Sequence, residues 1–413
     1  MNKEKIQLKI YDIVWLLFYI ALYTFNGLFD NSQIIYTAML LLTSILHLLS
    51  RGNYVRIKLI NRTDCVFWYG IFYLYIVISY FWSSTGGRAS QNTAFALVQS
   101  VIFLLCIDWY VRTERELEIL MRWYCLASLF FAVVVLVTSP PSSYGQLAFG
   151  SFTGMQRNST GYILMFAAIL DVYRAITKKK KYYYFMAAIC CVVSLLTGSR
   201  KVIIGYAIAV VSAIYLQKSI AKVIKSFLGI ILLLIIAIPL IYQIPFMQEV
   251  FGLRLLAIFD DTIVDGSVLA RENAKELAIA LTIKSPIIGN GWNSVVSSYI
   301  EYWGGTESIY AHNNYLEVAA NFGLIGIVLF YWRFATVLFK SWKCARVNIK
   351  YKLLTIVFLI VIILDYGQVT YCYLFMMTIF SIFLKMFVIE NAKENKKREL
   401  EISDENKNCY SIQ

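Results

Sequence analysis

A polar loop runs into an apolar stretch at Ile309-Tyr-Ala-His-Asn-Asn-Tyr-Leu-Glu-Val-Ala-Ala-Asn-Phe-Gly-Leu-Ile-Gly326, and the apolar run continues to Phe334. A run of this length predicts a membrane-spanning helix. His312, one of 2 histidines in the chain, stands just before that helix. Its imidazole can take or give a proton near neutral pH, and the positive end of the helix dipole lies beside it. We therefore predict a catalytic role for His312 at the membrane surface.

Two structural interpretations of the same stretch stay open. Asn313 or Asn314 can cap the helix, and Glu317 follows Asn314 at the spacing of a capping box. A histidine at a membrane boundary is also often an interfacial residue held by hydrogen bonds. The stretch alone does not choose between catalysis and structure.

The chain as a whole has the composition of a membrane protein, with 59% hydrophobic and 15% charged residues in a length of 413. Apolar runs of roughly 16 to 23 residues recur, close to the length that crosses a bilayer as a helix. We predict an all-α integral membrane protein with about 12 transmembrane helices. The runs cover residues 10–29, 34–49, 65–82, 93–110, 119–138, 159–176, 182–198, 202–217, 226–244, 314–334, 353–370 and 372–389.

The positive residues predict the orientation of these helices, because Lys and Arg gather in cytoplasmic loops. With the N-terminus in the cytoplasm, 29 of the 38 basic residues fall in alternate, cytoplasmic segments. The net charge of +13 is therefore explained mostly by topology, and it calls for no nucleic acid. We predict that both termini are cytoplasmic and that the charged tail, residues 390–413, is disordered.

One long loop, residues 245–311, is predicted on the outer side between a bundle at 1–244 and C-terminal helices at 312–389. From Val268 to Ile283 its apolar residues recur at spacings of three and four, which predicts an amphipathic helix on the membrane or on the bundle. Acidic residues outnumber basic ones in this loop. Its cluster Asp260, Asp261 and Asp265 fits a cation site less well than a solvated loop.

Cations at the outer surface are candidates for binding phosphate. Arg200 and Lys201 lie in Thr197-Gly-Ser-Arg-Lys201, which joins two predicted spans with almost no loop. A guanidinium offers forked donors to phosphate, although such cations can also simply reach lipid head groups. Arg157 opens the sixth predicted span, after a turn-rich loop that is either a sugar-binding surface or a connector. The 8 cysteines show no metal-ligand spacing, so we predict no metal site.

Several segments together resemble the O-antigen ligase and polysaccharide polymerase family. The pair His312-Asn313 with Gly323-Leu-Ile-Gly326 resembles the family signature His-Asn...Gly-x-x-Gly. The other matching segments are the Ser199-Arg200 turn, Arg271 ahead of Pro286-Ile-Ile-Gly-Asn-Gly291 and, more loosely, residues 150–158. The resemblance implies a helical glycosyltransferase fold of the GT-C-like kind, with its active site on the outer face.

The resemblance also implies a chemistry and roles for residues. Family members transfer a saccharide from an undecaprenyl-diphosphate donor to a sugar hydroxyl, without a cofactor or metal. His312 would act as the base and Arg271 beside it as a second catalytic residue. The donor diphosphate would be bound by Arg200, Arg271 and Arg254, with Asn313 and Arg157 in support.

Polymerase and ligase are the two activities within this family. A polymerase joins repeat units of capsule or O-antigen on the lipid carrier, and a ligase moves the finished glycan to lipid A core or protein. A chain rich in Lys, Ile, Asn and Tyr is typical of AT-rich bacterial capsule loci, which favours a polymerase in the bacterial cytoplasmic membrane, working with a flippase and a chain-length regulator. A polysaccharide-lipid flippase and a non-catalytic assembly protein remain the alternatives from other classes.

Overall fold

The computed structural model describes residues 9–26, 32–50, 63–83, 91–146, 148–217, 266–303 and 309–410. These residues form helices and contain no strand. The helices are α1 (Ile10–Thr24), α2 (Ser32–Ser50), α3 (Cys65–Ser79), α4 (Gln91–Tyr110), α5 (Glu114–Thr138), α6 (Arg157–Lys178), α7 (Tyr182–Leu196), α8 (Arg200–Tyr215), α12 (Gly266–Lys284), α13 (Ser294–Trp303), α14 (Asn314–Cys344), α15 (Ile349–Leu364) and α16 (Leu374–Tyr410). Short 3-10 turns lie at Tyr80–Trp82, Pro141–Ser143 and Ser151–Thr153.

The all-α prediction is confirmed for the described residues, but the predicted number of spans is not. Within the described ranges, five helical stretches are long and apolar enough to cross a membrane: Cys65–Trp82, Glu114–Thr138, Arg157–Lys178, Asn314–Cys344 and Leu374–Glu401. Other predicted spans, such as α1 and α7, are helical but shorter. The predicted span 226–244 lies outside the described residues. The chain is thus a multi-pass membrane protein, since several apolar helices pack side by side.

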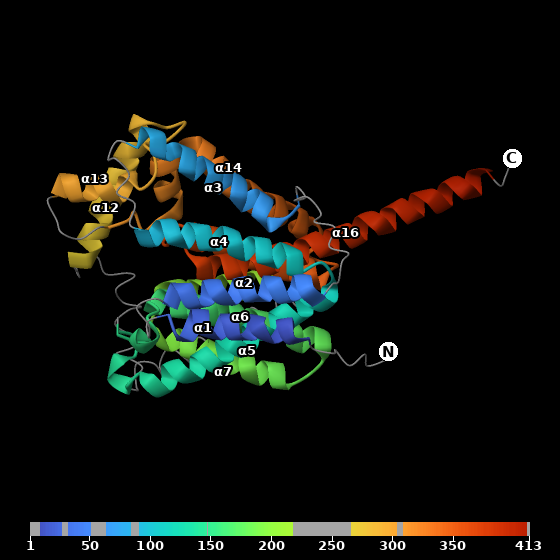
Figure 1. Cartoon of the computed structure of the whole chain (residues 1–413). Helices are drawn as coiled ribbons and strands as arrows, with labels where there is room; N and C mark the ends of the chain where they lie inside the picture. The colour runs from blue at the N-terminus through green and yellow to red at the C-terminus, as the bar shows by residue number, and fades with distance from the viewer. Residues whose placement is uncertain are drawn as a thin grey trace.

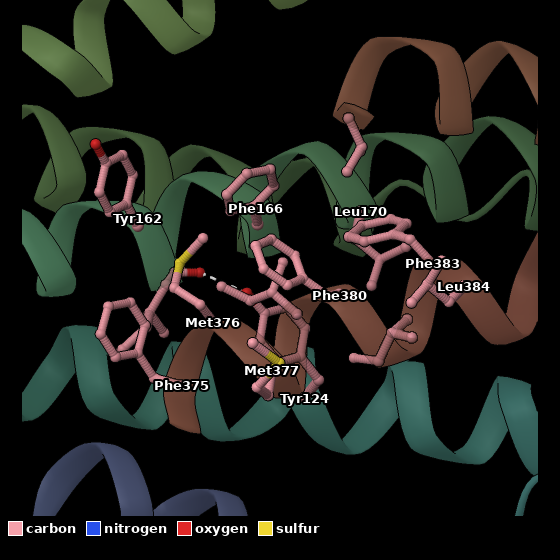
Figure 2. Packing of buried hydrophobic residues seen from close by; sticks show 14 of the residues in the cluster. Tyr124, Tyr162, Phe166, Leu170, Phe375, Met376, Met377, Phe380, Phe383 and Leu384 are labelled. Carbon is pink, nitrogen blue, oxygen red and sulfur yellow. Dashed lines mark hydrogen bonds between the residues drawn. The ribbon is translucent and has the colours of Figure 1, made fainter. Parts of the chain in front are cut away.

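The bundle packs around the first half of α16. Figure 1 shows α1, α2, α4, α5 and α6 lying side by side, with α12 and α13 at one end and the free part of α16 projecting from the other. Aromatic and methionine side chains of α16 fill the space between α5 and α6 (Figure 2). Phe380 and Phe383 of α16 and Phe166 of α6 are at most 1% exposed. Tight packing of this kind is what holds helices together where lipid supplies no hydrophobic force.

A buried ion pair ties α16 to the start of α3. Asp108 of α4 accepts hydrogen bonds from the backbone N–H groups of Cys65 (3.1 Å) and Val66 (2.7 Å), the first residues of α3. Its carboxylate also lies 2.7 Å from Nζ of Lys385. A carboxylate at a helix N-terminus satisfies orphan donors and favours the helix dipole. Asp108 is therefore a structural group that joins three helices.

The helix that follows His312 is broken at Gly323, which the sequence pattern did not predict. Gly323 has φ 65° and ψ −164°, so the helical backbone stops there and resumes at the next residue. The segment Pro286–Gly291 enters the break. Leu324 N donates to Pro286 O (2.8 Å) and Ile325 N to Ile287 O (3.2 Å), while Asn290 N and Gly291 N donate to the carbonyls of Ala320 (3.0 Å) and Asn321 (2.9 Å). The loop thus replaces the helical partners that the break removes.

Glycine is required on both sides of this contact. A Cβ on Gly289 would lie 2.4 Å from backbone atoms of Asn321 and Phe322, and a Cβ on Gly323 would lie 2.3 Å from the carbonyl oxygen of Ile287. Both glycines also have positive φ, a conformation that other residues adopt at a cost. The glycine motifs at 286–291 and 323–326 therefore pack against each other in one backbone contact.

Two helices extend beyond the apolar runs that predicted them. The helix predicted at 314–334 continues to Cys344, and the tail predicted as disordered is helical to Tyr410. The tail is rich in Glu, Lys and Leu, which are good helix formers, and Lys397 lies 3.7 Å from Glu401 one turn later. Charge alone is therefore a poor sign of disorder when a helix already precedes the charged segment.

Because of this backbone contact, we expect alanine at Gly289 to destabilise the protein more than alanine at Gly70 does. Gly289→Ala should destabilise the folded protein by about 2 kcal/mol or more, because the new methyl group meets backbone atoms at a positive φ. Gly70→Ala in α3 is the matched control, since a Cβ there meets no atom within 4 Å. Thermal unfolding of the protein in detergent would measure both. Equal unfolding midpoints for the two variants would contradict a tight contact at Gly289.

Candidate active site

His312 lies in a turn that its neighbours hold on both sides. The residue has φ 52°, the left-handed region that few non-glycine residues adopt. Before it, Ala311 N donates to the buried carboxylate of Glu317 (2.7 Å). After it, the side chain of Asn313 caps α14 by accepting from Leu316 N (3.1 Å). The cap is thus Asn313 rather than Asn314, and the predicted capping-box role of Glu317 is wrong: its partner is Ala311.

The environment of His312 favours its neutral form. The imidazole stacks on Tyr310 with ring centroids 4.1 Å apart. Burial, together with the positive charges of Arg271, Lys201 and Lys275, lowers the pKa of His312 to about 4. A neutral imidazole near pH 7 has a lone pair free to accept a proton, which is the state that a general base needs.

The cations around His312 come from separate helices. Arg271, predicted here, is exposed on α12, and Lys275 lies one turn further along the same helix. Lys201, the second residue of α8, is half-buried. These elements are far apart in the sequence, yet all three charges act on His312. Of the predicted site cations, Arg271 therefore acts on His312, together with Lys201 and Lys275.

The turn between α15 and α16 places two of these cations. Nζ of Lys201 donates to the carbonyl of Gly367 and to Oε1 of Gln368 (3.0 Å). Nζ of Lys275 lies 5.9 Å from the centroid of the Tyr366 ring, a cation–π distance. The turn thus draws α8 and α12 together beside His312.

Asp365 fixes that same turn to the start of α14. Its buried carboxylate accepts from Tyr331 OH (2.7 Å), Thr370 Oγ1 (2.9 Å) and Asn314 Nδ2 (3.2 Å). Asn314 N also donates to the Asp365 carbonyl (2.8 Å). The sequence left Asp365 without a role, although an acid within an apolar run is a signal of function. In the structure, Asp365 holds Asn314, the second residue after His312, in place.

The other predicted site residues differ in how the structure places them. Arg157 is the first residue of α6; its Nη1 donates to Gly145 O (3.0 Å) and its charge acts on Lys201. Arg200 is exposed at the first position of α8, one residue before the cation that acts on His312. Arg254 lies outside the described residues, as does the cluster Asp260, Asp261 and Asp265. Within the described ranges, no three His, Cys, Asp or Glu side chains group as metal ligands.

Residues 185–331 match the family model described as O-antigen ligase. The matched segment, which is less than half of the 413 residues, is similar to an O-antigen ligase domain. The resemblance inferred from the sequence motifs is thereby confirmed. The matched range includes Lys201, Arg271 and His312, whereas Arg157 and Asp365 lie outside it. No curated protein matches the chain.

The positive charge around His312 can be tested directly by titrating this histidine. The chain has 2 histidines, so a His47→Gln background leaves His312 as the single signal in a histidine-labelled NMR titration. We expect His312 to titrate near pH 4. Lys275→Gln should raise its pKa by roughly half to one unit, because one repelling charge is removed.

The matched control is Lys284→Gln, which removes the same charge from the last turn of α12. It should leave the His312 titration unchanged. A His312 pKa near the ordinary value in the His47→Gln protein would show that the cations do not surround the imidazole.

Proposed function

We propose that the protein is a membrane glycosyltransferase that moves a saccharide from a polyprenyl-diphosphate carrier to a sugar hydroxyl. One observation carries the proposal: burial and the charges of cations on two other helices lower the pKa of the half-buried His312 imidazole. A base and an anion-binding cluster side by side are what glycosyl transfer from a diphosphate requires. The O-antigen ligase domain spans both parts.

The proposed reaction uses His312 as the base. The neutral imidazole accepts the proton of the acceptor hydroxyl while the hydroxyl oxygen attacks the anomeric carbon of the donor sugar. The bond between that carbon and the diphosphate oxygen breaks, and the electron pair leaves with the diphosphate. Charge grows on the diphosphate in the transition state, so cations fixed in advance lower the barrier.

The cations would share the stabilisation of the leaving diphosphate. Arg271 and Lys201 are the nearest candidates, because their charges act most strongly on His312 after burial. Lys275 would add a third charge. Arg200 and Arg254 keep their predicted roles in donor binding, and Asn313 and Arg157 are proposed to support the site by holding the His312 turn and the loop at Gly145.

Within this chemistry, we propose a polymerase of capsule or O-antigen repeat units on undecaprenyl diphosphate, at the outer face of the bacterial cytoplasmic membrane. The support for a polymerase over a ligase is the Lys-, Ile-, Asn- and Tyr-rich composition. A chain-length regulator and a flippase that delivers the repeat unit are the proposed partners. An enzyme is proposed over a flippase, because three cations act on His312 just before the capped start of α14.

The decisive test is the polysaccharide ladder of cells that carry His312→Ala or Arg271→Ala. We expect each variant to lose at least about 100-fold in polymer formation, since a general base and a charge clamp each contribute on that order. Single repeat units on the lipid carrier would support a polymerase. Full-length polymer left on the carrier would instead identify a ligase.

The control for both variants is Lys284→Ala, a charge change at the exposed end of α12. Membrane levels of all three proteins are compared by immunoblot. A normal ladder in His312→Ala at normal protein level would refute the catalytic proposal and leave a structural role.

A further inference from the structure

A cationic cavity of about 250 Å³ lies at the opposite end of α6 from Arg157. The 22 residues of α6 separate the two ends by about 33 Å, so this cavity is distinct from the His312 site. It is lined by residues of α5, α6, the α6–α7 turn and the start of α7: Glu118, Ile119, Arg122, Arg174, Lys178, Lys180, Tyr182 and Tyr183. None of the residues proposed for glycosyl transfer lines it.

The lining of this cationic cavity carries an excess of positive charge. Four of its residues are basic and Glu118 is acidic. Arg174 and Lys178 both pair with that carboxylate at 3.3 Å. Arg122 and Lys180 form no ion pair within the described part of the chain. Two cations therefore face the cavity without a protein anion to neutralise them.

The wall of the cavity is fixed before any ligand arrives. Arg174 is 1% exposed and its Nη2 donates to Tyr183 OH (3.0 Å). Its guanidinium lies 4.3 Å from the Tyr183 ring centroid, and Nη1 lies 3.6 Å from Asp171 Oδ1. Nε of Arg174 is buried and has no hydrogen-bond partner among the described residues. Arg174 is therefore a fixed positive charge in the wall of the cavity.

The surroundings indicate that this anion belongs to a lipid. Tyr182, which lines the cavity, is 51% exposed, and Tyr184 and Phe185, which follow it on α7, are 50% and 69% exposed. Exposed aromatic residues at the end of an apolar helix mark the level of the lipid head groups. The cavity is also at the end where α16 leaves the bundle, because Lys393 of α16 lies 2.6 Å from Glu114, one turn before Glu118.

We propose that this cavity binds the phosphodiester head group of an anionic phospholipid. Oxygens of the phosphate would accept from Arg122 and Lys180 at the mouth, with Arg174 and Lys178 behind them. The lipid would anchor the α6–α7 hairpin in the leaflet that the termini face. Basic cavities between helices on the cytoplasmic side of membrane proteins commonly hold such head groups.

The test compares lipid binding by matched charge variants of the full-length protein. Phosphatidylglycerol is titrated into the protein in neutral detergent, and bound lipid is counted by native mass spectrometry. Arg122→Gln with Lys180→Gln should weaken binding by about tenfold or more, since each cation near a lipid phosphate contributes to affinity. The control, Arg398→Gln with Lys396→Gln, removes the same two residue types from the exposed part of α16 and should bind as wild type does.

Each other outcome overturns the proposal. Equal binding by all three proteins would show that the cavity holds no lipid. Equal binding of phosphatidylcholine would show that anionic charge is not recognised. Heat stabilisation by inorganic phosphate as large as that by phosphatidylglycerol would assign the cavity to a free anion instead. Monodisperse elution of the cavity variant shows that it is folded.

Discussion

The structure depends on the backbone contact at the break in α14. Leu324 and Ile325 lose their partners within the helix at Gly323, and unpaired backbone groups are especially costly at membrane depth. Pro286–Gly291 supplies replacements for the N–H groups and uses the freed carbonyls in return. No side chain can lie between the two segments, since Gly289 and Gly323 meet main chain directly. The break therefore fixes the loop that carries α12 against the helix that begins after His312.

From this contact, polar bonds extend to the candidate active site. In the first turn of α14, Glu317 accepts a hydrogen bond from Ala311 N. Asn314, in the same turn, donates one to the carboxylate of Asp365. The Asp365 turn also accepts from Lys201 of α8. Three segments far apart in the sequence thus share one rigid frame around His312. Charges that are held in place before a reaction begins stabilise a charged transition state most effectively.

Sequence patterns predicted the parts of this frame but not how they join. The hydrophobic runs predicted the helices. The spacing of His312 and the glycine motifs predicted which residues belong to the site. The break at Gly323 could not be predicted, because glycine in an apolar run usually continues a membrane helix. The choice of Lys201 over Arg200 as the cation near His312 depends on helix phase, which two adjacent residues do not reveal. Asn314 and Asp365 meet through folding, since 51 residues separate them.

The docking of Pro286–Gly291 into α14 also bears on how such a protein can evolve. Its four main-chain hydrogen bonds hold the chain immediately before residue 292, and Glu317 holds it immediately after 310. In the segment that follows this loop, Val295 N donates to Asn321 Oδ1 (3.1 Å), so α13 is also tied to α14 beside the break. The loop, α13 and the first part of α14 are therefore constrained to change together in evolution, because each is bonded to the others through main-chain groups.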